Sequence, residues 1–251
     1  MKLQEEVRFS NLKNMSRSPA HYRYSVEQQR EDTLALRLGR LTDAIIFETP
    51  GVVIWDGIRR GKAWDAFKAT NINADIFTLS EFEPAKEMAL AIQRHDLAMQ
   101  LLDGDRQHTL RWDYVGRKCR GTPDCFTSKR IVDLKTARNA HPDKFRRDAI
   151  WYGYHAQLAW YLNGIESTLG KRPEEAFIVA VESAAPYPIT IHQLTPRALD
   201  MGERMCRLWM ERLLVCEASG SWPGYCEAVV PFDVIDDSFE LQIDGETVEV
   251  E

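Results

Sequence analysis

Two carboxylates and a lysine stand close together in the segment 121–136, which has the sequence GTPDCFTSKRIVDLKT. Within the predicted strand 131–135, side chains alternate between two faces, so that Asp133 and Lys135 share one face. A turn between two short strands would fold the chain back and bring Asp124 to the same place. Two carboxylates beside a lysine can bind a hard divalent cation next to a group that orients water or handles a proton.

The same residues are also compatible with an ordinary solvated strand edge. Asp and Lys two positions apart often form a surface ion pair, and Pro-Asp is common in turns. Val132 and Leu134, however, fall on the opposite face and indicate a strand with one buried side. A polar face on such a strand needs a reason, and we therefore treat the segment as a candidate metal site.

A helix predicted from about Thr33 to Phe47 adds a third carboxylate. Its apolar positions recur with the helical period, at Leu34, Leu38, Leu41 and Ile45. Gly39 in mid-helix costs about 1 kcal/mol relative to Ala, which indicates close backbone packing at this point. Asp43 lies one turn further on the same face, among apolar neighbours. It is either a paired surface charge or a metal ligand.

A second helix is predicted from about Pro142 to Leu162, and Gln157 and Tyr161 lie one turn apart on it. Its packing residues would be Ile150, Tyr154, Leu158 and Leu162. A buried helix with an incidental glutamine is the alternative. A basic run follows the candidate metal site and continues into the start of this helix; it could neutralise phosphates, through Arg138, His141, Lys144, Arg146 and Arg147.

The other predicted elements complete a mixed α/β pattern. A short helix near the N-terminus would be capped by Ser10 and end before Pro19. An amphipathic helix over 80–103 would begin with a capping box of Ser80 and Glu83, and Thr195 would cap a helix over 196–218. Strands are predicted at 52–55, 108–115, 176–182 and 189–194, with a hairpin over 241–250.

Basic and aromatic residues also alternate at 59–67, where Arg59, Arg60 and Lys62 precede Trp64 and Phe67. This combination suits either a nucleic-acid groove or a solvated loop.

Composition describes an ordinary globular protein of 251 residues, with 44% hydrophobic and 28% charged residues. We expect a single domain over 1–251, with its core at about 33–220 and an acidic tail at about 227–251. The apolar runs are too short to span a membrane and the N-terminus lacks a signal peptide, so we expect a cytoplasmic location. Five cysteines without a Cys-x-x-Cys pair argue against disulfides, a zinc ribbon and an iron–sulfur cluster.

The net charge of −6 is unfavourable for a protein that binds nucleic acid. Many of the acidic residues are concentrated in the tail, however, and the central part of the chain is closer to balanced or basic.

Together the segments resemble the PD-(D/E)xK nuclease superfamily, and within it the phage-type recombination exonucleases, the group of exodeoxyribonuclease VIII and, more distantly, lambda exonuclease. The matching motifs follow the family's order: SPAHY at 18–22, LGRLTD at 38–43, GTPD at 121–124, DLKT at 133–136, YGYHAQ at 152–157 with Tyr161, and WPGY at 222–225. This order makes the resemblance more specific than any single motif.

The resemblance implies an α/β (α+β) fold in which a central mixed β-sheet flanked by helices forms a restriction-endonuclease-like nuclease core. It implies one active site per subunit, with one or two Mg²⁺ or Mn²⁺ ions as cofactor. The metal ligands would be Asp43, Asp124, Asp133 and the carbonyl of Leu134. Related nucleases often have histidine where this chain has Asp43, but aspartate is also an oxygen donor that suits Mg²⁺.

The resemblance also implies catalytic roles for Asp124, Asp133, Lys135, Gln157 and Tyr161. Lys135 would orient or deprotonate the attacking water and stabilise charge. The Gln-x-x-x-Tyr pair on the second helix would support the site and the substrate strand.

The expected activity is that of a Mg²⁺-dependent exodeoxyribonuclease on double-stranded DNA ends, acting 5′ to 3′ and leaving 3′ single strands for phage-type homologous recombination. The expected partners are further copies of the chain, in a ring-shaped trimer or tetramer, and a single-strand annealing protein. Arg17, Arg40 and Arg146 are the expected phosphate contacts. Two alternatives stay open: an endonuclease or structure-specific nuclease of the same superfamily, and a non-catalytic DNA-binding or assembly protein.

Overall fold

A five-stranded mixed sheet forms the centre of the computed structural model, which describes residues 5–28, 32–226, 228–230, 239–243 and 246–250. Across the sheet the strands are β10 (Ile189–Gln193), β9 (Glu175–Glu182), β8 (Arg130–Ala137), β7 (Cys125–Phe126) and β4 (Asp105–Arg106). Strands β8 and β9 are parallel, and the other pairs are antiparallel. The expected mixed α/β fold is thereby confirmed.

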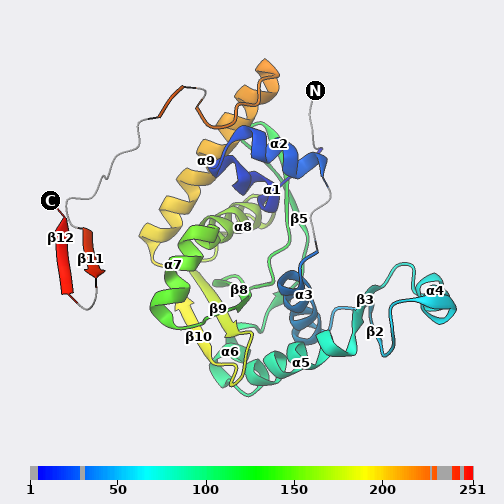
Figure 1. The fold of residues 1–251 in the computed structure, drawn as a ribbon. Coiled ribbons are helices and arrows are strands. Elements are labelled where there is room, and N and C mark those ends of the chain that lie inside the picture. The colour runs from blue at the N-terminus through cyan, green and yellow to red at the C-terminus, as the bar shows by residue number, and fades with distance from the viewer. Residues whose placement is uncertain (1–4, 29–31, 227, 231–238, 244–245, 251) are drawn as a thin grey trace.

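Helices cover both faces of this sheet (Figure 1). On one face lie α1 (Phe9–Leu12), α8 (Tyr154–Leu169) and α9 (Pro196–Ser219); on the other lie α3 (Leu34–Phe47), α5 (Leu79–Gln93) and α6 (Asp96–Leu101). Strand β8 contributes residues to the hydrophobic cores on both faces of the sheet. Ile131 packs on the first face, and Val132 and Leu134 pack on the second. The predicted alternation along this strand is confirmed.

A smaller three-stranded sheet stands beside the first, in the order β1 (Val7–Arg8), β6 (Arg117–Gly121) and β5 (Leu110–Tyr114). The N-terminal elements η1 (Lys13–Ser16) and α2 (Pro19–Glu27) follow α1. Tyr22 on α2 stacks on Trp222, and the Ala20 amide donates to the Pro223 carbonyl at 3.1 Å. The first and last family motifs, far apart in sequence, therefore pack together.

Residues 52–78 form an arm that projects from the body of the molecule (Figure 1). It consists of β2 (Val52–Trp55), α4 (Gly61–Thr70) and β3 (Asp75–Thr78), and its two strands are parallel. The predicted strand 52–55 is confirmed, whereas the basic and aromatic stretch that follows it leads into a helix.

Several predicted boundaries are wrong. The helix from Pro142 is two helices, α7 (Pro142–Tyr152) and α8, because Gly153 adopts a left-handed conformation with φ of 73°. Consequently Ile150 is 58% exposed instead of packed. The helix expected over 80–103 is likewise two, α5 and α6.

Two predicted helix caps are also wrong. Ser18 rather than Ser10 caps a helix, since its hydroxyl accepts the His21 amide and Pro19 begins α2 instead of ending a helix. The capping box of α5 uses Thr78 and Glu81, two residues earlier than expected.

Other elements match the sequence predictions. Thr33 and Thr195 cap α3 and α9, and the C-terminal hairpin forms from β11 (Phe239–Ile243) and β12 (Glu246–Val250). Its expected turn, Asp244-Gly245, lies outside the described residues. Within the described part of the chain, no helix combines the length and apolar character needed to cross a bilayer.

The packing of α9 against α8 gives a stability prediction. A Cβ atom on Gly202 would lie 2.6 Å from the His155 carbonyl oxygen and 2.8 Å from Ala156 Cα. Gly202→Ala is therefore expected to destabilise the protein by about 1–3 kcal/mol, although Ala normally stabilises a helix by about 1 kcal/mol over Gly. Urea unfolding would measure the shift. Gly224→Ala, with nothing within 4 Å of its Cβ, should leave the midpoint unchanged.

Candidate active site

The β7–β8 hairpin brings two of the predicted carboxylates together. Cys125 pairs with Val132 in the register of the hairpin, which places Asp124 beside the middle of β8. An Asp124 Oδ2 atom accepts a hydrogen bond from the Leu134 amide at 2.8 Å. The segment thus folds back as its sequence predicts, and the hydrogen bond fixes the carboxylate against the strand that carries Asp133.

Lys135 forms an ion pair with Asp133 on the face of β8 that they share. The Asp133 side chain is buried, and that of Lys135 retains 18% exposure. Burial lowers the pKa of Lys135, but the charges of Asp133 and Asp124 outweigh burial and raise this pKa above its usual value. Lys135 therefore stays a cation at neutral pH.

Helix α3 supplies Asp43 from a segment far away in the sequence. At Gly39 a Cβ atom would lie only 3.2 Å from Thr136 Oγ1, so the glycine allows a close approach of the helix to β8, a partner that the sequence did not indicate. Burial raises the pKa of Asp43 to about 7; the negative charge of Asp133 adds to this effect, while Lys135 opposes it. Burial also raises the pKa of Asp124, with contributions from Asp133 and Asp43.

Helix α8 brings the predicted glutamine and tyrosine to the same place. Gln157 donates a hydrogen bond to the Tyr161 hydroxyl at 3.0 Å. Burial raises the pKa of Tyr161, as do the charges of Asp133 and Asp124, so this hydroxyl keeps its proton. The two predicted residues thus stand as a hydrogen-bonded pair next to the carboxylates.

Two residues at this site were not predicted to have a role there. The Lys135 ammonium lies 5.2 Å from the centre of the Tyr154 ring, a cation–π contact, although the sequence placed Tyr154 in the packing of the helix. Gly121 leaves room for Tyr161, since a Cβ on it would lie 2.8 Å from the tyrosine ring. The position of Tyr154, one turn before Gln157 on the helix, was a signal that could have identified it.

Most of these groups line a cleft of about 1240 Å³, but Asp124 and Asp133 are not part of its wall. Asp43, Leu134, Lys135, Gln157 and Tyr161 all contribute to its wall. The cleft also carries six further cations around this centre: Arg8, Lys13, Arg40, Arg120, Arg138 and Lys144. Lys144 pairs with Asp148 and Arg120 with Glu6. Cations still outnumber carboxylates in the wall of the cleft, which favours the entry of a polyanion in spite of the chain's net charge.

The predicted phosphate contacts lie in different surroundings. Arg40 lines the cleft, but Asp32 and Asp75 pair with it. Arg17 is exposed at the end of η1, and Arg146 is exposed on α7 and pairs with Asp143 at 3.2 Å; neither is among the residues that line the cleft.

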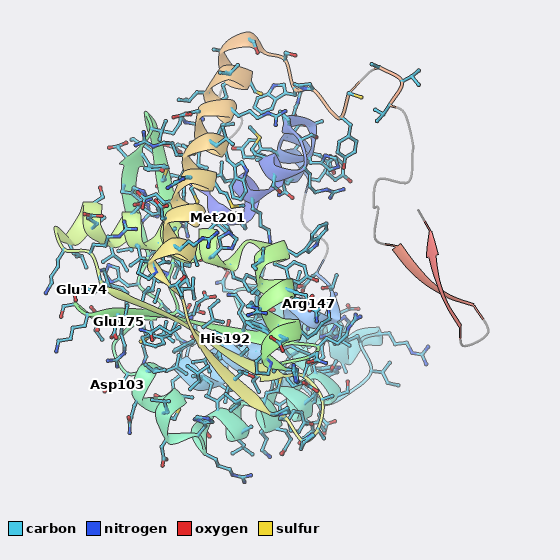
Figure 2. All side chains as sticks on the ribbon, turned by 90° about the vertical axis from the view of Figure 1, so that its left-hand side faces the viewer. Asp103, Arg147, Glu174, Glu175, His192 and Met201 are labelled. Atoms are coloured by element: carbon cyan, nitrogen blue, oxygen red, sulfur yellow. The ribbon has the colours of Figure 1, made fainter. Side chains whose placement is uncertain are left out.

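The basic run that leads into α7 divides in the same way. Arg138 and Lys144 line the cleft. Arg147 lies near β10, on the side of α7 that Figure 2 shows. This side faces away from the arm.

The chemistry of the donors fits a divalent cation. All candidate ligands are oxygen atoms, and the buried Asp133 Oδ2 contacts Lys135 without any hydrogen bond of good geometry. Among the described residues, no three His, Cys, Asp or Glu side chains are already gathered around one metal position. Asp43, Asp124 and Asp133 would therefore have to draw together around a cation, which would relieve their mutual repulsion.

The raised pKa of Asp43 gives a pH prediction for the metal-free protein. Its folded pKa of about 7 exceeds the unfolded value of 3.8, so the native state holds more protons and stability falls as pH rises through this range. Asp43→Asn should therefore stabilise the metal-free protein at pH 8 by about 2 kcal/mol, after allowance for screening, and have little effect near pH 4.

Urea unfolding with a chelator at both pH values would measure this difference. Added Mg²⁺ should then stabilise the wild type more than Asp43→Asn. The matched control is Asp200→Asn, which removes an exposed carboxylate that pairs with Arg204 on α9. Equal stability of wild type and Asp43→Asn at both pH values would contradict the assignment of Asp43 to this charge cluster.

Comparison with solved structures shows the fold. A crystal structure of an exonuclease candidate from Eubacterium rectale has a TM-score of 0.66 and 19% identity, over 92% of this chain and 91% of that one. An alkaline exonuclease from Laribacter hongkongensis has a TM-score of 0.31 and 13% identity, over 71% and 98% of the two chains. A phage-related exonuclease from Haemophilus somnus 129PT has a TM-score of 0.35 and 14% identity, over 84% of this chain and 95% of that one.

A comparison with curated proteins gives no match. A family model, in contrast, matches residues 8–232, which include every motif on which the resemblance was based. Its description is a PDDEXK-like domain of unknown function, and it confirms the predicted relationship to the PD-(D/E)xK nucleases. The chain belongs to this PDDEXK-like family, DUF3799.

Proposed function

We propose that this chain is a Mg²⁺-dependent exodeoxyribonuclease that hydrolyses phosphodiester bonds at double-stranded DNA ends in the 5′-to-3′ direction. The observation that carries this proposal is that Asp43, Lys135, Gln157 and Tyr161 line one cleft, beside the β7–β8 hairpin that brings Asp124 and Asp133 together. The exonucleases among the similar structures support the choice of activity.

The residues of the cleft would divide the chemistry between them. Asp43, Asp124, Asp133 and the Leu134 carbonyl would hold the cation, which when bound supplies Lewis-acid stabilisation of charge on the phosphodiester. Lys135, kept protonated by its acidic neighbours, would donate hydrogen bonds to the attacking water or to a phosphoryl oxygen. The Tyr154 ring holds its ammonium from the other side.

The Gln157–Tyr161 pair would position the scissile strand. Tyr161 is fixed by the space at Gly121 and by its hydrogen bond with Gln157, so its hydroxyl is a preorganised group at the wall of the cleft. The cations along the cleft, including Arg8, Arg120 and Arg138, would neutralise the phosphates on either side.

The wider setting of the enzyme follows from the same resemblance. We propose that it acts in phage-type recombination as a ring-shaped trimer or tetramer threaded by DNA, and that a single-strand annealing protein takes up the 3′ strands it produces. A ring would place several cationic clefts around one duplex, which suits a chain with a net charge of −6.

Replacing the lysine tests the assignment of the site. Lys135→Ala removes the cation that faces Asp133 and is expected to lower the rate of DNA hydrolysis about 10²–10³-fold, while duplex binding is retained. Release of nucleotides from end-labelled duplex with Mg²⁺ would measure the rate. Lys129→Ala, at the exposed turn of the same hairpin, should leave it unchanged. Undiminished hydrolysis by Lys135→Ala would remove this residue from the mechanism, and no hydrolysis by the wild type would favour a non-catalytic DNA-binding protein.

The preference for ends is tested by the shape of the substrate. The exonuclease should degrade linear duplex DNA and leave a covalently closed circle intact, because the circle offers no end. A gel assay with both substrates in one tube, with the label at either the 5′ or the 3′ terminus of the linear DNA, would give activity and direction together. Cleavage of the circle would instead support an endonuclease of the same superfamily.

A further inference from the structure

The arm formed by β2, α4 and β3 has a surface that the active site does not use. None of the residues of α4 is buried, and the helix lies at the outer end of the arm (Figure 1). Its aromatic residues do not face a groove. Trp64 and Phe67 pack on Trp55 of β2, with ring centres 5.7 and 4.7 Å away, and so fasten the helix to the strand.

Positive charge is concentrated on this surface. Residues 56–70 contain four cations, Arg59, Arg60, Lys62 and Lys68, against the two carboxylates of Asp56 and Asp65. Arg59 and Lys68 lie over the Trp64 ring, at 5.8 and 5.4 Å from its centre. Arg60 and Lys62 are exposed, and no ion pair involves either of them within the described part of the chain.

The arm is joined to the rim of the cleft by ion pairs. Glu81 at the start of α5 accepts hydrogen bonds from Arg37 on α3 and from Arg59 on the arm, at 2.5 and 3.0 Å. On the next turn of α3, Arg40 lines the cleft and donates to Asp75 at the start of β3, at 2.9 Å. The arm therefore begins at the rim of the cleft, where Arg40 lies.

We propose that the arm is a second contact for the backbone of duplex DNA, outside the catalytic cleft, with Arg60 and Lys62 as its phosphate-binding residues. This inference rests on the proposed function, since it takes duplex DNA to be the polymer that enters the cleft. The aromatic cluster holds the helix in place, and the exposed cations on it meet the sugar-phosphate chain without reading its sequence.

The surface suits a polyanion better than a second copy of the chain. Ile58 and Ile72 are exposed, at 67% and 81%, but no other large apolar side chain of the arm is, among the described residues. Stable interfaces between protein chains bury about 1,200–2,000 Å² and exclude charge from their centre. The two unpaired cations at the start of α4 do not fit the charge-depleted centre of such an interface.

The test removes the two charges and measures duplex binding without cleavage. Arg60→Gln/Lys62→Gln is compared with Lys129→Gln/Lys171→Gln, which removes two exposed lysines near Glu174 and Glu175 on the face seen in Figure 2. Binding to a blunt duplex of about 30 base pairs is measured with a chelator at several salt concentrations, and circular dichroism confirms that both variants are folded. The double charge reversal Arg60→Glu/Lys62→Glu is measured alongside.

For Arg60→Gln/Lys62→Gln, the magnitude of the slope of log K for duplex binding against log salt concentration should fall by about 2, because each phosphate contact contributes about 0.9. The affinity at about 0.1 M salt should fall about 10- to 100-fold. Charge reversal should weaken binding further, and the control pair should change neither quantity. An unchanged slope, an equal loss in the control, or a loss confined to single-stranded DNA would overturn the proposal. So would unchanged DNA binding with a changed oligomeric state in analytical ultracentrifugation, which would make the arm an interface between copies.

The Lys135→Ala protein is measured in the same series to separate this inference from the proposed function. If that protein binds the duplex with a normal salt slope but does not cleave it, the site is confirmed whatever the arm variant shows. If the wild type neither binds nor cleaves duplex DNA, the proposed function itself fails.

Discussion

The structure depends on one electrostatic arrangement, a lysine ammonium placed among three carboxylates at the end of a cleft. Asp43, Asp124 and Asp133 repel one another, and burial makes their repulsion more costly because water no longer screens it. Lys135 offsets part of this cost in the metal-free protein. A bound divalent cation would offset the remaining cost of this repulsion. In the metal-free protein, the three carboxylates can stay close together only if some of them keep their protons.

The surrounding elements serve to maintain that arrangement. Three segments meet there. Helix α3 approaches β8 closely at Gly39, and the β7–β8 hairpin is held by the pairing of its strands. Helix α8 places Tyr161 beside Gly121. The approaches of α3 and α8 each depend on a glycine, and the hydrophobic cores on the two faces of the sheet support them. The polar centre is thus held by packing on both sides of a single strand.

Local pattern predicted much of this from the sequence. Three patterns each place residues on one face of an element: the alternation around Asp133 and Lys135, the apolar stripe on α3, and the one-turn spacing of Gln157 and Tyr161. Residues on the same face stay together when the element packs. The pattern could not give the break at Gly153, since a glycine in a helical sequence is compatible with both a continuous and an interrupted helix. The spacing of Tyr154, one turn before Gln157, placed it on the face of the site, but it could not give the contact with Lys135, because a cation–π contact joins residues on different elements.

Helix α3 has a mechanical consequence for the molecule. Its first turns hold Arg37 and Arg40, which are tied to the arm through Glu81 and Asp75, and its next turn holds Asp43 at the catalytic centre. The distance along the helix from Arg40 to Asp43 is about 4.5 Å, less than one turn, and a helix transmits displacement over such a length with little loss. Strain on the arm would therefore reach Asp43, the carboxylate that we propose as a metal ligand.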